Sequence, residues 1–366
     1  MTSDERAAMS PGAGRSHERA TIRDVARVAG VSVTTVSRAL GGSADRVKPD
    51  TLAKITRAVD QLDFVVNAHA RALAGRGSRS VAFLVADMVG PSFALLASGV
   101  EAVATELGYL FMLFTTHGDV DRESELMDSM REQRSAAVLL VGAVVPSPEY
   151  ERRIAAYARE LASVGSKLVL CGRPPISTRP DVMSVEYDNF GGGYAVTQHL
   201  LELGHRSMLF VGAIEGHSSS MPRFAGHRAA LADAGITNGE LLDPVPDTFD
   251  VDSAHAAVGA ALDAGARPTA IVAVTDYVAV GALRALRERG IRVPDDMSLT
   301  GFDDLPLITD LTPSLTTVTV PFAELGRATT ELALNGTGSP AYKHVVLPVA
   351  LTIRESTAAP QAAVKR

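Results

Sequence analysis

A run of small hydroxyl side chains that ends in an arginine suits contact with a polyanion. Residues Ser32–Arg38 read SVTTVSR. Serine and threonine hydroxyls can hydrogen-bond phosphate oxygens, and an arginine can reach the edge of a guanine in the major groove of DNA. Because these hydroxyl side chains are small, a helix that carries them could approach a duplex closely. The pattern favours DNA binding over an ordinary solvated helix surface.

Three short helices must position these side chains. Thr21 is a candidate N-cap for a helix with apolar residues at helical spacing, and Gly30 ends that helix. Ser32 is placed to cap a second helix, Val33–Leu40, and Pro49 suits the first position of a third. Two short helices joined by a three-residue turn that contains glycine match the helix-turn-helix pattern.

The charge of the chain is divided unevenly between this module and the rest. The 366 residues include 35 Lys and Arg against 42 Asp and Glu, a formal net charge of −7. Residues 17–79 hold eleven basic and six acidic side chains, a net charge of +5, and residues 80–366 therefore carry −12. A basic module ahead of an acidic body confines the expected polyanion contact to the first part.

Length and composition limit the class of protein. A chain of 366 residues predicts two or three domains, and 46% hydrophobic residues predict globular ones. The single cysteine, Cys171, excludes an intramolecular disulfide and fits a reducing cytosol. Residues 1–20 read as a polar tail and no signal peptide, and the longest apolar run, Ala136–Val145, is about half of a membrane span. We therefore expect a cytoplasmic protein.

Longer motifs resemble one known family. TIRDVARVAGVSVTTVSRAL (Thr21–Leu40) looks like the opening of the lactose-repressor/galactose-repressor (LacI/GalR) family of bacterial transcriptional regulators, and NAHARALAG (Asn67–Gly75) resembles its hinge helix. The likeness covers essentially residues 20 to 356. It continues through SVEYDNFGGGYAVTQHLLELGH, RFAGHRAAL, TDYVAVGALRALRERGIRVPDDMSLTGFDD and PSLTTVTVP.

The resemblance implies a sequence-specific DNA-binding regulator, expected to be a repressor. Such a protein acts as a homodimer, or as a higher oligomer, on the double-stranded DNA of a pseudo-palindromic operator, away from any membrane. A small-molecule effector, expected to be a sugar or related metabolite, would control operator affinity allosterically, and the resemblance implies no cofactor and no metal. The expected DNA-binding residues are Thr21, Ile22, Ser32, Val33, Thr34, Thr35, Ser37, Arg38, Asn67, Ala70 and Leu73.

The hinge segment is too short to be a stable helix alone. Asn67 can cap a helix over residues 68–74, which Gly75 ends. In the family this helix folds when two copies meet in the minor groove, where a leucine wedges between base pairs. The matching residue here is Leu73. The alternative is a linker helix whose leucine packs against the body.

The remaining chain alternates apolar strands with amphipathic helices. This alternation predicts parallel sheets covered on both faces. It repeats from Ser184, so we expect two doubly wound α/β lobes, which resemble the periplasmic-binding-protein fold that the family shares. The expected parts are a flexible tail (1–19), an all-α helix-turn-helix domain (20–66), a hinge and linker (67–79), an N-terminal lobe (80–183 with about 321–341), a C-terminal lobe (184–320 with about 342–357) and a tail (358–366).

Polar and aromatic side chains follow several of the predicted strands. Ligands of open α/β sheets sit beyond the carboxyl ends of the strands. Two arginines, two aspartates and aromatic rings in one cleft would suit a hydroxyl-rich ligand. The resemblance carries the family's effector contacts to Phe93, Arg223, Thr275, Asp303 and Phe322, and Asp276 could instead be structural. The candidate effector residues are Ser92, Phe93, Arg173, Arg223, Thr275, Asp276, Phe302, Asp303 and Phe322.

The candidate pocket departs from the family's pattern at three positions. Gly172, next to Arg173, stands where many sugar-binding members place a carboxylate. Thr275 replaces the asparagine of the lactose type, and Val320 replaces a polar residue. A pocket without these polar groups would take a less hydroxylated, smaller or differently oriented ligand, so the ligand's identity stays open.

Catalytic constellations are missing from the sequence. DNFGGGY (188–194) has neither a dinucleotide fingerprint nor a phosphate loop, and its glycines are expected to allow close helix–sheet packing. GHSSS (216–220) is no nucleophile elbow, and the nine histidines form no HExxH pair. His205 is expected to be a turn residue and Cys171 an inert buried thiol. We expect no enzyme. The alternatives are a sugar-binding transport protein, against which the basic head argues, and a sugar-metabolising enzyme.

Overall fold

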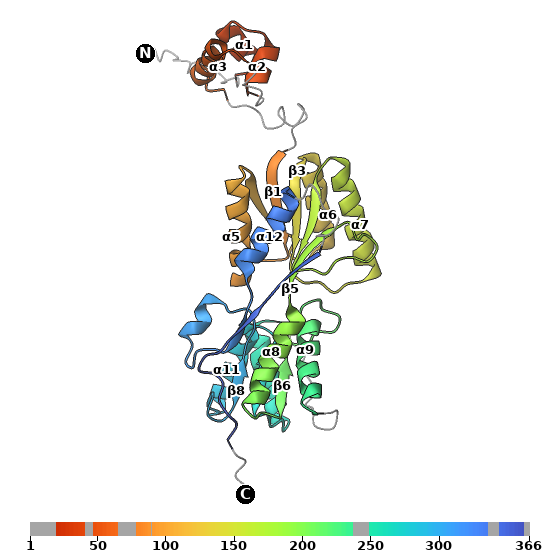
Figure 1. Cartoon of the computed structure of the whole chain (residues 1–366), viewed down its shortest axis with the longest axis vertical. Helices are drawn as coiled ribbons and strands as arrows, with labels where there is room; N and C mark the ends of the chain where they lie inside the picture. The colour runs from red at the N-terminus through yellow and green to blue at the C-terminus, as the bar shows by residue number, and fades with distance from the viewer. Residues whose placement is uncertain are drawn as a thin grey trace, which may run out of the picture. The chain divides into compact units, whose positions relative to one another are not determined.

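The chain folds into two compact units, residues 1–78 and 79–366 (Figure 1). The structure, a computed structural model, describes residues 20–40, 47–64, 78–88, 90–236, 249–335 and 344–361. Within them the first unit is helical and the second contains helices and strands. The expected hinge residues Asn67, Ala70 and Leu73 and the expected tail 1–19 lie outside the described residues.

The first unit contains three short helices, as the sequence predicts. The hydroxyl and the backbone N–H of Thr21 both donate to the Asp24 carboxylate, at 2.7 and 3.0 Å, at the start of the first helix. Gly30 ends that helix with a φ of 67°, a left-handed conformation that glycine adopts readily. Val36 and Ile55 are fully buried in the shared core. The helices are α1 (Ile22–Ala29), α2 (Val33–Leu40) and α3 (Pro49–Gln61).

The second unit contains two lobes. The first, lobe 1, consists of a six-stranded sheet and the helices that cover it. Its strand order is β10-β5-β4-β3-β1-β2, and β1–β2, β3–β4, β4–β5 and β5–β10 pair in parallel. The strands are β1 (Ser78–Val85), β2 (Leu110–Thr115), β3 (Ser135–Val141), β4 (Lys167–Cys171), β5 (Met183–Tyr187) and β10 (His344–Leu347). The covering helices are α5 (Pro91–Glu106), α6 (Val120–Glu132), α7 (Pro148–Ser163) and α12 (Phe322–Asn335).

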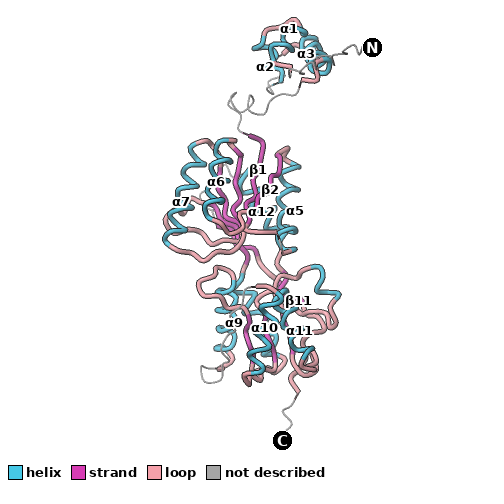
Figure 2. The backbone as a smooth tube through the Cα atoms, turned by 180° about the vertical axis from the view of Figure 1, so that it is seen from behind, coloured by secondary structure: helices cyan, strands magenta, loops and turns pink. Residues whose placement is uncertain are grey.

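Helices cover both faces of this sheet. Figure 2 shows α6 and α7 on one side of the strands and α5 on the other. Along β1, Val81, Phe83 and Val85 join one hydrophobic cluster, and Ala82 and Leu84 join another. Side chains alternate between the two faces of a strand, so an unbroken apolar run fills two cores.

The second lobe, lobe 2, contains a smaller parallel sheet, a pair of antiparallel strands and the helices around them. Its strands pair in the order β6-β7-β8, and β9 and β11 pair antiparallel with each other. Helix α8 packs on α9, and α10 packs on α11. The elements are α8 (Asn189–Glu202), β6 (Met208–Val211), α9 (Ser220–Asp233), α10 (Val251–Asp263), β7 (Ala270–Ala273), α11 (Asp276–Glu288), β8 (Ser298–Thr300), the 3₁₀ helix η2 (Pro306–Asp310), β9 (Thr317–Thr319) and β11 (Ala350–Thr352).

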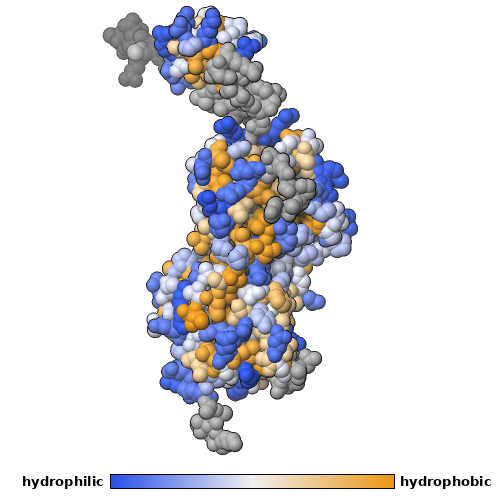
Figure 3. All heavy atoms as spheres, in the orientation of Figure 1, coloured by the Kyte–Doolittle hydropathy of each residue, from blue (hydrophilic) through white to orange (hydrophobic). Residues whose placement is uncertain are grey.

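Three chain segments connect the lobes. They run from β5 into α8, from β9 into α12 and from β10 into β11. On the face shown in Figure 3, apolar residues gather around this junction. Across the described ranges, no helix combines the length and hydropathy needed to cross a bilayer.

The predicted boundary between the lobes is wrong by one strand. The sequence assigns β5 to the second lobe, but β5 pairs with β4 of lobe 1. β10 lies within the expected C-terminal-lobe range 342–357, but it pairs with β5. A short apolar strand does not encode which sheet it joins, because its partner lies far along the chain.

The predicted tail also begins too early. Ala358, its expected first residue, is anchored in lobe 2. Its carbonyl lies 2.8 Å from His205 Nε2, and its N–H donates to Ser298 Oγ at 3.0 Å. His205 is buried and also lies 2.9 Å from the Thr269 hydroxyl, so this histidine ties three segments together.

The glycines of the DNFGGGY motif allow α8 to pack closely on strands, as predicted, and also on a helix. A Cβ on Gly192 would lie 2.6 Å from the ring of Phe302, which follows β8, and 3.1 Å from Cγ1 of Val318 in β9. A Cβ on Gly193 of α8 would lie 2.1 Å from the carbonyl oxygen of Arg223 in α9. A Cβ on Gly226 of α9 would lie 2.1 Å from the carbonyl oxygen of Phe190. Because the contacts of Gly193 and Gly226 involve backbone atoms, the two helices approach each other more closely than any side chain allows. This contact sets the position of Arg223.

Candidate functional site

Helix α2 presents hydroxyl and arginine side chains to solvent. Thr34, Ser37 and Arg38 are exposed, whereas Val36 on the opposite side is fully buried. Val33 is 41% exposed although it is apolar. An exposed valine beside hydroxyls and an arginine matches the mixture of groups that reads base edges and thymine methyls in a major groove.

Other side chains of the head that are expected to contact DNA form hydrogen bonds or packing contacts within the head itself. The Ser32 hydroxyl accepts the Thr35 N–H at 3.1 Å and lies 2.8 Å from the Thr35 hydroxyl. The Thr21 hydroxyl donates to Asp24, and hydrogen bonds from Arg27 and Thr21 hold the pKa of that carboxyl well below its usual range. Ile22 packs against the core of the head. These groups fix the two helix starts that frame the exposed face.

In the second unit, Arg223 joins elements of both lobes. It lies in the first turn of α9 and is only 3% exposed. Its Nε donates to Asn189 Oδ1 at 2.8 Å, and its Nη2 donates to the Tyr187 hydroxyl at 3.0 Å. Its Nη1 donates to the carbonyl of Val274, which directly follows β7, at 2.5 Å. Since Tyr187 ends β5 of lobe 1, this guanidinium ties the two lobes together beside their junction.

Asp303 and Phe302 complete the surroundings of Arg223. Nη2 of Arg223 lies 3.4 Å from Asp303 Oδ1, and Cζ lies 3.7 Å from the centroid of the Phe302 ring. Burial raises the pKa of Asp303 to about 6, against the opposing effect of the Arg223 charge. Asp303 has a φ of 116°, which side-chain-bearing residues rarely adopt. Such strain is common at ligand sites, where the surrounding structure enforces it.

Aromatic rings extend this cluster toward lobe 1. Phe322, at the start of α12, is buried, and its ring packs edge-on against Tyr187 with centroids 6.0 Å apart. The structure therefore brings together five side chains, and we call this set the Arg223 cluster. Its members are Tyr187, Arg223, Phe302, Asp303 and Phe322.

Other predicted effector residues lie outside the Arg223 cluster. Ser92 and Phe93 are half-buried at the start of α5, where the Phe93 ring lies beside Gly142. Arg173 is buried and donates from Nη2 to the carbonyl of Val141 at 3.0 Å. Its guanidinium faces the ring of Tyr150 in α7, at 5.9 Å from the centroid.

Thr275 and Asp276 serve the fold of lobe 2. The Thr275 hydroxyl caps α11 by accepting the N–H of Val278 at 3.2 Å. Asp276 is 1% exposed and accepts the Thr317 hydroxyl at 2.6 Å and the Leu305 N–H at 2.8 Å. Burial and the nearby Asp303 raise the pKa of Asp276 to about 8. Both of its oxygens hold neighbouring segments, which favours the structural alternative for this residue.

Three further side chains lie at this site that are not among the predicted effector residues. Tyr187 and Asn189 flank the connection from β5 into α8, so the rule that ligands bind beyond strand ends could have identified them. His217 lies before α9, and its ring packs against Phe249 with centroids 4.9 Å apart. Burial and the Arg223 charge lower the pKa of His217 to about 4, so the imidazole is neutral at pH 7. No periodicity marks this loop histidine.

Two hydrogen bonds join the lobes away from the connecting segments. The Ser218 N–H donates to the Val144 carbonyl at 2.7 Å, and the Val144 N–H donates to Ser218 Oγ at 3.0 Å. Val144 follows β3 of lobe 1, and Ser218 precedes α9 of lobe 2. We call this pair of bonds the lobe clasp. It holds the two lobes together in the conformation described.

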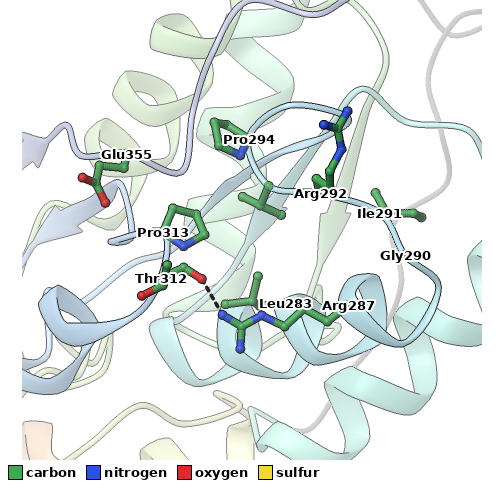
Figure 4. Close-up of a pocket in the computed structure, with 10 residues that line it drawn as sticks. Leu283, Arg287, Gly290, Ile291, Arg292, Pro294, Thr312, Pro313 and Glu355 are labelled. Atoms are coloured by element: carbon green, nitrogen blue, oxygen red, sulfur yellow. Dashed lines mark hydrogen bonds between the residues drawn. The ribbon is translucent and has the colours of Figure 1, made fainter.

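A separate pocket of about 590 Å³ opens elsewhere on lobe 2 (Figure 4). It lies at the C-terminal end of α11, where Arg287 donates to the Thr312 carbonyl. Leu283, Pro294 and Pro313 contribute apolar surface. None of the predicted effector residues lines this pocket, so its size is no guide to the effector site.

Comparisons with known proteins agree with this architecture. A family model described as "Bacterial regulatory proteins, lacI family" matches residues 21–67, and one described as "Periplasmic binding protein-like domain" matches residues 197–357. The HTH-type transcriptional regulator DegA of Bacillus subtilis (strain 168) is 31% identical, over 93% of this chain and 98% of that protein. The regulator CelR of Thermobifida fusca is 32% identical, over 92% of this chain and 98% of its own length.

Solved structures share the fold over most of this chain. The lac repressor dimer bound to operator and the anti-inducer ONPF aligns with a TM-score of 0.81 at 23% identity, over 93% of this chain and 100% of that one. The CelR–cellobiose complex aligns with a TM-score of 0.66 at 30% identity, over 92% and 100%. Because regulators more than 30% identical to this chain match it over almost their full length, the chain belongs to the LacI family of bacterial regulatory proteins.

Proposed function

We propose that this chain is a transcriptional repressor whose affinity for an operator is set by a small molecule bound between the two lobes. The observation that carries the proposal is the union, in one chain, of an exposed hydroxyl and arginine face on α2 with a two-lobed body whose junction buries polar groups. Relatives named as ribose operon repressors support the function, and the cellobiose complex of CelR supports a sugar as effector.

The Arg223 cluster is the proposed centre of the effector site. A guanidinium and a carboxylate at 3.4 Å can each bind hydroxyl groups, and Phe302 and Phe322 offer aromatic surface to sugar C–H groups. His217 adds a neutral imidazole. In the conformation described, all three nitrogens of Arg223 already donate to protein atoms. Of these bonds, the one to the Tyr187 hydroxyl joins the lobes, because Asn189 and Val274 both belong to lobe 2. We propose that an effector replaces this bond.

Replacement of a hydrogen bond of Arg223 by the effector would link effector binding to DNA binding. An effector that takes over a bond of Arg223 changes the relative free energies of two lobe arrangements, and a ligand shifts a conformational equilibrium only by such a difference. We propose that the chain acts as a homodimer, as the lac repressor does in its operator complex, because two half-sites require two-fold symmetry. The lobe arrangement would then set the spacing of two DNA-binding heads.

A binding assay with the full chain tests the proposed function. Fluorescence anisotropy with duplexes from the region upstream of the chain's own gene, together with selection from a random duplex pool, should recover a near-palindromic site. A thermal-shift screen with sugars should give compounds that change affinity for that site. Compounds that bind while the chain binds no duplex would instead indicate a solute-binding protein.

A further inference from the structure

A buried arginine of lobe 1 lacks a carboxylate partner. Arg173 is 6% exposed, and the only hydrogen bond of its side chain among the described residues runs from Nη2 to the Val141 carbonyl. Its Nε, also buried, has no acceptor there, and no carboxylate of the described chain forms an ion pair with it. Burying a charge without a partner is strongly unfavourable. Arg223 differs, because Asp303 lies within ion-pair distance of it.

A second unpartnered donor lies beside Arg173. Tyr150 is 5% exposed, and its hydroxyl has no hydrogen-bond partner among the described residues. Burial raises the pKa of Tyr150, so the phenol keeps its proton and can donate it to an acceptor. Glu123, a buried carboxylate near this tyrosine, is already held by Arg153 Nε at 3.1 Å. The four side chains together carry one uncompensated positive charge.

These groups lie at the edge of lobe 1 that faces the lobe junction. Arg173 follows β4, Val141 ends β3, and Tyr150 lies in the first turn of α7. These are the carboxyl ends of parallel strands, where ligands of α/β sheets bind. Gly172, next to Arg173, leaves open space: a Cβ built there would have no atom within 4 Å apart from its own chain neighbours. A negatively charged group could occupy that space without displacing a side chain.

We propose that the effector carries an anionic group, a carboxylate or a phosphate, which pairs with Arg173 and accepts a hydrogen bond from the Tyr150 hydroxyl. This inference rests on the proposed function and narrows its effector from sugars in general to acidic or phosphorylated ones. The loop that joins β3 to α7 connects Val141 to Tyr150, and its Val144 forms the lobe clasp with Ser218. Anion binding at Arg173 therefore acts on a loop that holds the lobes together.

Matched acidic and neutral probes test this inference on the full chain. Isothermal titration calorimetry is run with D-glucose, D-glucuronate, D-gluconate and D-glucose 6-phosphate, so that the carboxylate and phosphate arms are separate. At least one acidic probe should bind roughly tenfold or more tightly than glucose. Arg173→Gln should abolish that preference and Tyr150→Phe should weaken it. Arg159→Gln, which removes an exposed arginine of α7 in the same lobe, should leave it intact.

Three outcomes overturn the inference. They are tighter binding of the neutral probe, binding of no acidic probe, and an acid preference that survives both Arg173→Gln and Tyr150→Phe. Tyr150→Phe removes one oxygen atom only, so it keeps the test valid if Arg173→Gln does not fold. Anisotropy with the operator duplex, measured without any effector, is independent of this result. Failure to bind any duplex, both without an effector and with each probe, contradicts the proposed function. Control by a neutral effector alone contradicts only the anionic group.

Discussion

A few side chains with opposite degrees of burial account for the two proposed activities. On α2, the groups that would meet DNA are exposed and form no buried network. In the body, Arg223 and Asp303 are buried and already bonded. Exposed groups can be changed with little effect on stability, whereas removing one partner of a buried pair leaves the other uncompensated. Substitutions at the two sites should therefore differ in their effect on folding.

Arg38→Ala should change sequence preference as well as affinity. Loss of an arginine that reads a base edge is worth about 1–3 kcal/mol and relaxes preference at one position of each half-site. Arg57→Ala, an exposed arginine on α3, removes the same charge from the same unit and should lower affinity without changing preference. Selection from a random duplex pool measures both variants. An unchanged preference in Arg38→Ala would remove this residue from base recognition.

Asp303→Asn should uncouple DNA binding from the effector. Asparagine keeps the size of the side chain and tolerates a positive φ better than most residues, but it lacks the charge that faces Arg223. We expect effector affinity to fall by about tenfold or more, with operator affinity retained in the absence of effector. Calorimetry and anisotropy measure the two affinities. Asp310→Asn, an exposed carboxylate, is the control, and wild-type effector affinity in Asp303→Asn would exclude Asp303 from the site.

At the scale of elements, the sequence predicts the order of helices and strands better than their partners. The three helices of the head follow from Thr21, Gly30 and Pro49, which are local signals. The sheet that β5 joins depends on β4 and β10, which no local pattern specifies. The same limit applies to the site. Position after a strand identifies Asp303, but only the fold shows that Arg173 faces Tyr150 and lies apart from the Arg223 cluster.

Ser218→Ala should loosen the lobe clasp. The substitution removes the hydroxyl that accepts the Val144 N–H at 3.0 Å, and a hydrogen bond of this kind is worth about 0.5–1.5 kcal/mol. The lobes should separate more readily, so effector association should be faster than in the wild type. Stopped-flow fluorescence with the identified effector measures the rate. Ser129→Ala removes a hydroxyl that bonds only within α6 and should leave the rate unchanged. Equal rates in all three proteins would contradict a gating role for the clasp.

Across the whole molecule, the net charge differs in sign between the DNA-binding head and the body. Residues 17–79 carry a net charge of +5 and residues 80–366 carry −12, so the attraction to phosphates is confined to the head. The acidic body should keep the rest of the chain away from the duplex. The fold class could be predicted from the strand and helix alternation because that signal repeats many times. The identity of the effector could not be predicted, because the shape and charge of its site depend on a few contacts between residues far apart in the sequence.

Buried histidines should make the body sensitive to acid. His227 is buried with its Nδ1 2.9 Å from the Thr197 hydroxyl, and desolvation lowers its pKa to about 3. Between that value and the ordinary pKa of 6.5 the unfolded chain binds more protons, so the free energy of unfolding falls as the pH falls through this range. One such group contributes at most about 1.4 kcal/mol per pH unit.

Urea unfolding at pH 4 to 7 measures this dependence. His227→Gln should flatten the slope, even if it also lowers stability at pH 7, whereas His117→Asn, which removes an exposed histidine, should keep it. The buried Asp276 acts in the opposite direction. Its pKa is raised to about 8, so its contribution to stability is lost as the pH rises toward that value. A slope that His227→Gln does not change would assign the acid sensitivity to other groups.

The affinity of the full chain for its operator, measured by fluorescence anisotropy with and without the effector, tests most directly whether a small molecule controls DNA binding. We predict a defined near-palindromic site, an effector that changes the dissociation constant at that site, and an Asp303→Asn variant that binds the site but no longer responds. An effector that binds the body and leaves the dissociation constant unchanged, or a chain that binds all duplexes equally, would contradict this prediction.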